Sequence, residues 1–465
     1  MATVLIAACG ASPTPALMSP AHAPTSTPTA PQVAAAETPT YTPTTTLTFT
    51  PTTTPSPTAT TPPTGTPTST PVPTDTPNPT PSPSPTPSDT PTLTATPIPS
   101  CTAGKELGDM EVVRVAVDPL NSQNVYATLR GEGVYKSCDG GETWSLSFKS
   151  ESVEGIAIDP VNPQRVYVGV WEGVLRTSDG GASWEVRGRQ HGLPQGQTIR
   201  VLAVDPNGPE TIYGGTGDGW PATGTRLVKS NDGGDSWTPW GMPQPEKEYA
   251  IDALAVDPTS GAIVYVGITA TDRQGVDRGH EHSDVYKSFD GGASWTPLKI
   301  PTVVSPWVNS PFRNVHDLAI VPEEPEVVFA ATSLGLLKSW DGGLTWLDIT
   351  PLGPCSVSIA QPPEPIFAIA VDPHNDQVVY AGVRVLAPDN FWLHRSGLDK
   401  SVDGGFSWVT ATNGFPRWNR GECGPVSTVG TNAIAIDPTN SQVIYAATTG
   451  GLFRSKDGGN SWGRR

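Results

Sequence analysis

Long apolar runs, cysteines and basic residues are all scarce in this chain of 465 residues. No apolar run approaches the roughly 18 residues that a membrane-spanning helix needs, so we expect no transmembrane segment. The five cysteines form no Cys-x-x-Cys pair, and no Cys/His spacing indicates zinc, so we expect no metal and no cofactor. Lys and Arg number 28 against 45 Asp and Glu, and the net charge of −17 disfavours a nucleic-acid partner.

Basic residues are absent altogether from residues 1–100, whose only acidic residues are Glu37, Asp75 and Asp89. Residues 101–465 therefore carry 14 of the 17 net negative charges. From about Thr38 to Pro99 the chain is almost entirely Thr, Pro and Ser, a composition that cannot bury enough apolar surface to fold. We expect residues 10–100 to be a disordered linker that favours extended polyproline II, at roughly 3.1 Å per residue.

The first nine residues end in Ile6-Ala7-Ala8-Cys9, which resembles the lipobox of bacterial lipoproteins. No basic residue precedes the apolar stretch, and the stretch is shorter than that of a normal signal peptide. Two interpretations stay open: a signal whose start lies upstream of Met1, and a chance match in an Ala-rich segment. On the first, the protein is extracytoplasmic, either secreted or lipid-anchored at the cell surface through Cys9, with no other membrane contact.

An eight-residue motif, Ser/Thr-x-Asp-Gly-Gly-x-Ser/Thr-Trp, occurs seven times. The octamers are SCDGGETW (137–144), TSDGGASW (177–184), SNDGGDSW (230–237), SFDGGASW (288–295), SWDGGLTW (339–346), SVDGGFSW (401–408) and SKDGGNSW (455–462). Such self-similarity along one chain is the sequence signature of a repeat architecture.

Each octamer follows three short apolar runs and precedes a fourth, as in VVRVAV, NVYATL, GVYKS and SLSF of the first repeat. An Asp-Pro turn follows the first run in six repeats, while the fifth has Val321-Pro322. Four strands per repeat and seven repeats predict an all-β fold, a single seven-bladed β-propeller over residues 101–465.

The octamer resembles the Asp-box, or bacterial neuraminidase repeat, of sialidases, sortilin-like receptors, xyloglucan-cleaving hydrolases and photosystem II assembly propellers. The carboxylate can accept hydrogen bonds from its own turn, the glycines permit positive φ, and the Trp can insert between sheets. Because every repeat carries one, we interpret the box aspartates as structural rather than catalytic: Asp139, Asp179, Asp232, Asp290, Asp341, Asp403 and Asp457.

With four strands A to D per blade, the Asp-Pro turns and the boxes belong to one face, and the B–C and D–A connections belong to the other. All the long insertions are B–C or D–A connections, and insertions on one face of a repeat array usually mark its binding surface. We expect rings and basic groups there to surround the mouth of the central channel and to bind the ligand: Trp220, Trp307, Arg313, Trp392, His394 and Trp418. For each ring, packing of its own loop is the alternative interpretation.

Three functions fit this arrangement. The first is a binding module for a glycan or protein ligand. The second is a glycoside hydrolase similar to the xyloglucan-cleaving enzymes, which typically carry two propellers where this chain has one. It would need two carboxylates on the loop face, with candidates Asp218, Asp272, Asp277, Glu281 and Asp389. The third is an assembly factor. A sialidase is disfavoured because no Arg-Ile-Pro-type motif precedes the first box.

Two further expectations concern closure and cross-links. Cys355 and Cys423 lie in successive D–A loops, so we predict a disulfide between them, with Cys101–Cys138 as a second pair. The last outer strand is short, and the sequence offers no obvious N-terminal segment to replace it. We therefore expect the ring to be weakest where it closes, in a protein that is a monomer.

Overall fold

The computed structural model describes residues 104–171, 173–193, 196–217, 227–241, 249–270, 285–300, 314–351, 364–384, 396–419 and 425–465. The chain separates into two units after Pro87, and all the described residues belong to the second. The expected linker and the lipobox-like segment lie outside the described residues. Within these ranges, no helix is long and apolar enough to cross a membrane.

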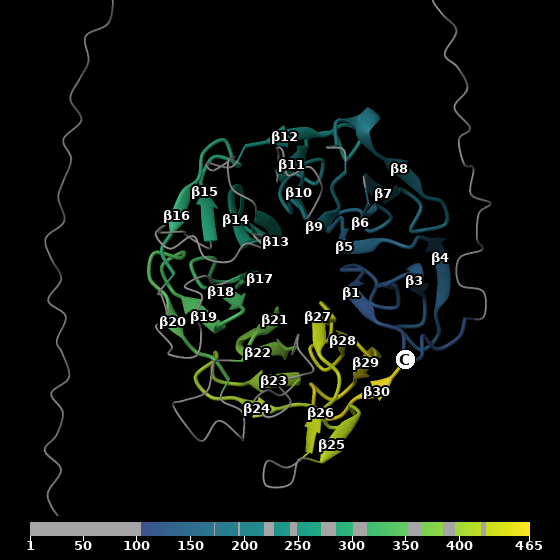
Figure 1. Ribbon diagram of the computed structural model, residues 1–465, viewed down its shortest axis with the longest axis vertical. Helices are drawn as coiled ribbons and strands as arrows, with labels where there is room; N and C mark the ends of the chain where they lie inside the picture. The colour runs from purple at the N-terminus through teal and green to yellow at the C-terminus, as the bar shows by residue number, and fades with distance from the viewer. Residues whose placement is uncertain are drawn as a thin grey trace, which may run out of the picture. The chain divides into compact units, whose positions relative to one another are not determined.

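The all-β propeller prediction is confirmed. In the described part of the chain, strands form seven four-stranded antiparallel sheets, each following the order of the sequence, placed radially around a common axis (Figure 1). The innermost strands, A, are β1 (Val112–Val117), β5 (Val153–Ile158), β9 (Ile199–Val204), β13 (Tyr249–Asp257), β17 (Val315–Ile320), β21 (Ile366–Asp372) and β27 (Thr431–Ile436). The B strands are β2 (Val125–Leu129), β6 (Val166–Val170), β10 (Ile212–Thr216), β14 (Ser260–Ala270), β18 (Val328–Thr332), β22 (Asn375–Val383) and β28 (Ile444–Thr448).

The two outer positions have shorter strands. The C strands are β3 (Gly133–Ser137), β7 (Gly173–Thr177), β11 (Leu227–Ser230), β15 (Val285–Ser288), β19 (Gly335–Ser339), β23 (Gly397–Ser401) and β29 (Gly451–Ser455). The D strands are β4 (Ser145–Lys149), β8 (Glu185–Arg187), β12 (Thr238–Trp240), β16 (Thr296–Leu298), β20 (Leu347–Asp348), β24 (Val409–Thr410) and β30 (Gly463–Arg464).

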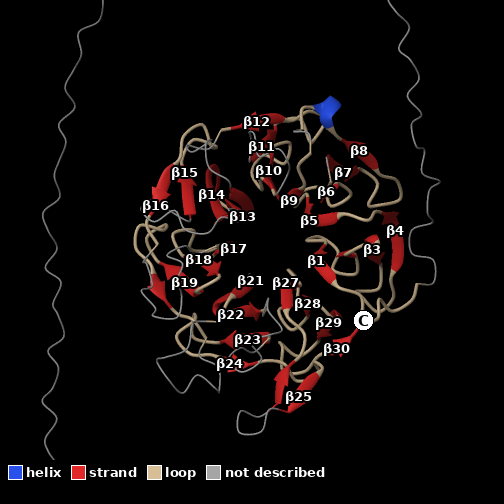
Figure 2. Cartoon of the chain, in the orientation of Figure 1, coloured by secondary structure: helices blue, strands red, loops and turns tan. Residues whose placement is uncertain are grey.

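Two additions to the blades were not expected from the sequence. A hairpin of β25 (Arg417–Asn419) and β26 (Pro425–Ser427) lies between the sixth and seventh blades. A single turn of 3₁₀ helix, η1 (Arg189–His191), follows β8 (Figure 2).

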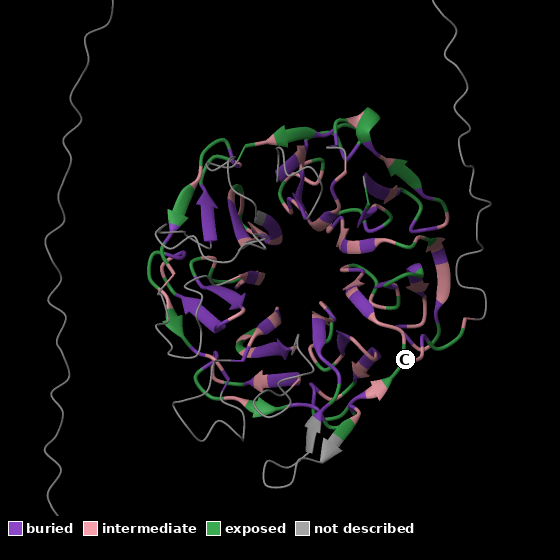
Figure 3. Cartoon of the chain, in the orientation of Figure 1, coloured by how far each residue is buried: buried purple, intermediate pink, exposed green. Residues whose placement is uncertain are grey.

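The core lies between the blades. The B strands are buried along most or all of their length, whereas most D strands are largely exposed (Figure 3). Among the described residues, each pair of neighbouring blades shares one hydrophobic cluster, and the box Trp of each blade packs into the cluster shared with the preceding blade. Each blade therefore depends on its neighbour for burial, as expected for a radial repeat.

The seven octamers, here called the boxes, have the same hydrogen-bond pattern in every blade. The first Ser or Thr hydroxyl accepts the N–H of the second glycine at 2.6–2.9 Å. One carboxylate oxygen of the Asp accepts the N–H four residues later at 2.8–2.9 Å. The other accepts that residue's hydroxyl at 2.5–2.7 Å. Both glycines have positive φ, from 64° to 99°, where a Cβ is strained.

Two side chains that recur in the repeats join each box to the blade before it. Tyrosines of five B strands donate to the carbonyl of the first box glycine of the next blade at 2.7–3.2 Å: Tyr126, Tyr167, Tyr265, Tyr380 and Tyr445. Lysines of five C strands donate to the same kind of carbonyl at 2.7–3.2 Å: Lys136, Lys229, Lys287, Lys338 and Lys400. The last tyrosine, Tyr445, reaches Gly140 of the first blade and so closes the ring.

The expectation that no N-terminal segment completes the seam is wrong, because residues 104–110 pack across it. That the ring is weakest at this seam stays a prediction. Lys105 exchanges two backbone hydrogen bonds of 3.0 Å with Trp144, the box Trp of the first blade. Leu107 is buried in the cluster that contains Tyr445 and Leu452 of the seventh blade. The residues after β8 and β24 contact the next box Trp in the same way, so this segment supplies what would otherwise follow β30.

Cys138 is disulfide-bonded. Its partner lies outside the described residues, so the predicted pairing with Cys101 stays a prediction. Cys355 and Cys423 also lie outside the described residues.

Candidate functional site

The face that carries the B–C and D–A connections, here the long-loop face, is only partly described. Five of the predicted binding residues lie outside the described residues: Trp220, Trp307, Arg313, Trp392 and His394. So do the candidate carboxylates Asp218, Asp272, Asp277, Glu281 and Asp389. The backbone of Trp418 belongs to β25, but its side chain is not described. Trp171, in the B–C turn of the second blade, is exposed.

The described candidate residues lie instead at the start of each inner strand, which is the end nearest the long-loop face. Every inner strand has a register shift near its start, where it pairs irregularly with its neighbour and leaves a bulge. A bulge leaves a residue unpaired and re-aims its side chain. We call the polar and aromatic residues at six of these bulges the axial ring: Glu154, Arg200, Asp252, His316, Phe367 and Asn432; the seventh bulge holds Val113.

Neighbouring members of the axial ring contact one another. The guanidinium of Arg200 pairs with the carboxylate of Asp252 in the next blade at 2.9 Å. The imidazole of His316 stacks on the ring of Phe367, with centroids 4.0 Å apart and planes 12° apart. Contact between side chains on successive inner strands places these side chains between adjacent blades.

A second set of contacts links members of the axial ring from the sixth blade, across the seam between the seventh and first blades, to the second blade. Arg384, just beyond β22, lies over Phe367 and donates to the amide oxygen of Asn432 at 2.8 Å. It also pairs with Glu111 at 3.7 Å. Glu111 in turn pairs with Arg130 at 2.9 Å, and Arg130 lies 3.9 Å from Glu154.

His316 is neutral at physiological pH. Burial, together with the positive charges of Arg200, Arg114 and Arg384, lowers its pKa to about 4, against the opposing effect of Asp252. Its Nε2 atom is buried and has no hydrogen-bond partner in the described structure. A buried polar atom without a partner is uncommon and is a candidate contact for a ligand.

The pKa of Asp317, the residue after His316, is shifted in the opposite direction. Burial raises its pKa to about 6, although its oxygens accept the N–H groups of Leu318 and Ile369 at 2.9 and 3.0 Å. A carboxyl that titrates close to neutrality can exchange a proton under physiological conditions, which is the requirement for general acid–base catalysis. Asp252 and Asp317 belong to the inner strands of adjacent blades, β13 and β17.

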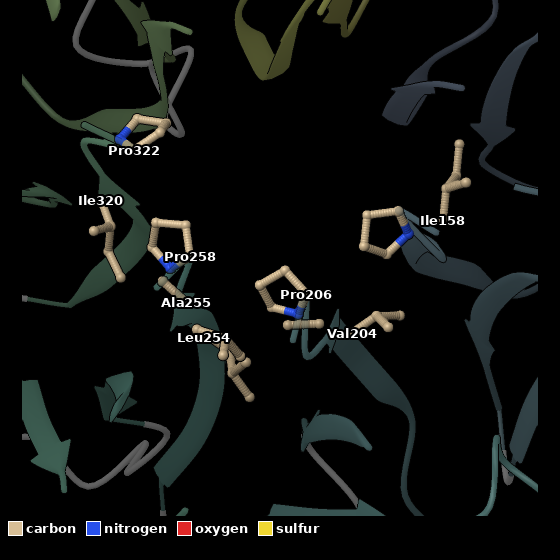
Figure 4. A pocket seen from close by; sticks show the side chains of 11 residues that line it. Ile158, Val204, Pro206, Leu254, Ala255, Pro258, Ile320 and Pro322 are labelled. Carbon is tan, nitrogen blue, oxygen red and sulfur yellow. The ribbon is translucent and has the colours of Figure 1, made fainter. Parts of the chain in front are cut away.

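At the other end of the inner strands, the carboxylates of the Asp-Pro turns are buried and accept N–H groups of their own turns, so the surface between these turns is apolar. A hollow of about 380 Å³ lies there, lined by strand ends such as Ile158, Val204 and Ile320 and by the proline rings of the A–B turns (Figure 4). Polar groups able to bind a hydroxylated ligand therefore gather at the end of the axis nearest the long-loop face.

Our sequence reasoning did not single out the axial ring, although a signal was present. When the inner strands are aligned, their fourth to sixth columns are uniformly apolar, with Ala always fifth, whereas the second column changes from Val to Glu, Arg, Asp, His, Phe and Asn. In a repeat, such a variable column within an apolar frame indicates a position freed from packing. Across the described ranges, no group of three or more His, Cys, Asp or Glu residues could hold a metal ion.

Comparison with known proteins finds xyloglucanases. No family model matches the chain. It is 26% identical to a xyloglucanase of Paenibacillus sp. over 345 residues, covering 63% of this chain and 30% of that protein. It is 25% identical to the xyloglucanase Xgh74A of Acetivibrio thermocellus over 453 residues, covering 77% of this chain and 51% of that one. The chain thus spans about a third to a half of these relatives.

Solved structures with a similar fold include enzymes of the same kind as these sequence relatives. The GH74 enzyme of Niastella koreensis aligns with a TM-score of 0.56 at 20% identity, covering 77% of this chain and 55% of that one. The GH74 xyloglucanase of Xanthomonas campestris aligns with a TM-score of 0.57 at 19% identity, with 78% and 55% coverage. At these identities the structures establish the fold. With the sequence relatives, they favour the hydrolase alternative over the binding module that we placed first.

Proposed function

We propose that this chain is an extracytoplasmic glycan-active propeller of the glycoside hydrolase type, acting on a xyloglucan-like polysaccharide. The observation that carries the proposal is the axial ring with Asp317 beside it: ion-paired Asp252, neutral His316 against an aromatic ring, and a carboxyl of raised pKa. The sequence relatives named xyloglucanases supply the substrate class.

The roles follow from the chemistry of each group. Asp317 is the proton donor, because a carboxyl with a pKa of about 6 retains a substantial protonated fraction near neutrality. Asp252, held by Arg200, is the second carboxylate that glycosidases require. Phe367 offers an apolar face beside these groups, and the free Nε2 of His316 is placed to bond a sugar hydroxyl.

The test is release of reducing ends from xyloglucan by the purified chain and by Asp252→Asn and Asp317→Asn. Each substitution should lower kcat by about 100-fold or more, the usual contribution of a general acid or base. Asp376→Asn, a half-buried residue near the start of β22 at the box-face end of the sixth blade, is the matched control and should leave kcat unchanged. Because Asp317 accepts two backbone N–H groups, the melting temperature of each variant separates lost chemistry from lost folding.

Two outcomes would overturn the assignment. Full activity in both variants would remove these carboxyls from the reaction. Binding of xyloglucan by the wild-type chain without any hydrolysis would restore the binding-module function.

A further inference from the structure

The face that carries the boxes and the A–B turns, here the box face, is not uniform around the ring. In three consecutive blades, the fourth to the sixth, large apolar side chains stand exposed at the second position of the octamer, and in the fifth and sixth blades also at the sixth position. Phe289 is 58% exposed, Trp340 44% and Phe406 67%, with Leu344 and Val402 beside them.

The other four blades act as internal controls. Their octamers have Cys138, Ser178, Asn231 and Lys456 at the second position, and Glu142, Ala182, Asp235 and Asn460 at the sixth. All seven boxes nevertheless have the same hydrogen bonds. The turn therefore does not require apolar groups at these positions, and packing of the box does not explain them.

The rings are fixed in place from beneath. Lys338 and Lys287 are only 5% exposed, and each ammonium bonds to a box glycine carbonyl of the next blade. The ammonium of Lys338 lies 4.9 Å from the centre of Trp340, and that of Lys287 lies 4.8 Å from the centre of Phe289. Trp340 and Phe406 then stack across the seam between two blades, with centroids 6.1 Å apart and planes 22° apart.

We propose that Phe289, Trp340 and Phe406 form a second polysaccharide-binding surface, an aromatic platform on the box face, remote from the axial ring. A glucan presents a row of sugar rings with apolar faces, and a row of rigid aromatic rings on successive blades matches such a polymer at small entropic cost. The inference rests on the proposed function for the choice of polymer.

Charge on the same surface favours a neutral polymer over a second protein copy. The box carboxylates Asp290, Asp341 and Asp403 lie among the rings, and hydrogen bonds within their turns lower their pKa, that of Asp290 and Asp403 to about 2. All three are therefore ionised at neutral pH. A second copy packed face to face would have to desolvate like charges, which is costly, whereas a glycan stacked on the rings leaves them in water.

The experiment measures binding of the catalytically inactive Asp252→Asn chain to polymeric xyloglucan by calorimetry and by affinity electrophoresis. Adding Trp340→Ala, Phe406→Ala or both should weaken binding about tenfold or more, as truncation of aromatic hot-spot residues does. Asn231→Ala, at the matching position of the third blade, is the control and should bind like its parent. Melting temperatures should stay within a few degrees, because the truncated side chains are exposed.

Failure of the platform and failure of the proposed function give different results. Unchanged polymer affinity in the double variant would overturn the platform, whatever the hydrolytic assay gives. Loss of affinity in the double variant, together with no hydrolysis of xyloglucan by the wild-type chain, would support the platform and overturn the hydrolase. Sedimentation settles the alternative occupant: a wild-type dimer that the double variant cannot form would make this surface a self-association face and overturn the proposal.

Discussion

At the scale of single residues, the box aspartates have the bonding expected of structural groups. Asp232 accepts the N–H of Ser236 at 2.9 Å and the hydroxyls of Ser236 and Ser230 at 2.5 and 2.7 Å. All of these bonds lie within one turn. That arrangement leaves the carboxylate occupied rather than free to act on a substrate.

We therefore expect Asp232→Ala to lower the free energy of unfolding by about 1–3 kcal/mol, because several donors lose their acceptor at once. Thermal or urea unfolding measures the change, with the exposed neighbour Asn231→Ala as the control. Xyloglucan binding should persist. A variant that loses binding while keeping its stability would show that this aspartate has a functional role.

Residues His316 and Asp317 predict a particular dependence on pH. The pKa of His316 falls from 6.5 to about 4 on folding, so acidification through that range protonates the unfolded chain first and lowers stability. The pKa of Asp317 rises from 3.8 to about 6, so acidification from pH 6 toward 4 protonates the folded chain first and raises stability. The two effects oppose each other between about pH 4 and 6.

Single substitutions should separate the two contributions to the pH dependence of stability. Relative to wild type, the melting temperature of Asp317→Asn should fall more steeply as the pH drops from 6.5 to 4, because only the histidine effect remains. That of His316→Gln should fall less steeply or rise. Scanning calorimetry at several pH values is the measurement, and profiles parallel to wild type would contradict the perturbed pKa values.

At the scale of elements, the N-terminal segment 104–110 is the part that sequence reasoning missed most clearly. It carries no octamer and no alternating pattern, so nothing in the sequence indicates that it completes a blade. Its role is visible only once Trp144 and Leu452 are brought together by the closed ring, since Leu107 packs with both.

Leu107→Ala should accordingly destabilise the propeller by about 2–5 kcal/mol, the range for removing a buried leucine side chain. Leu120→Ala, at a position that is 68% exposed, is the control and should change little. Chemical unfolding of both variants provides the comparison. Equal stabilities would mean that the seam closes through β27 to β30 and the first blade alone.

The elements themselves were largely predictable. An octamer recurs in every repeat and an Asp-Pro turn in six of the seven, and those local signals determine the strand number of every blade and the face to which each turn belongs. The axial ring was not predictable as a contact set, because Arg200 and Asp252 are paired by the radial placement of their blades rather than by sequence spacing. The aromatic platform likewise depends on Trp340 and Phe406 meeting across a seam.

In the described part of the molecule, the polar, apolar and aromatic surface groups occupy different places along the axis and on the two faces. The axial ring lies where the inner strands begin, a hollow lined by prolines and aliphatic residues lies where they end, and the exposed rings belong to three blades of the box face. A propeller of this kind can act on a polymer at one surface while holding it at another.

Hydrogen–deuterium exchange with a short xyloglucan oligosaccharide tests the central claim most directly, because it locates the ligand without depending on turnover. The account predicts slower exchange in peptides that contain the starts of β9, β13, β17 and β21, where Arg200, Asp252, His316 and Phe367 lie. Asp252→Asn should reduce that protection. Protection that leaves all four strand starts unchanged at saturating oligosaccharide would contradict the assignment of the axial ring as the site.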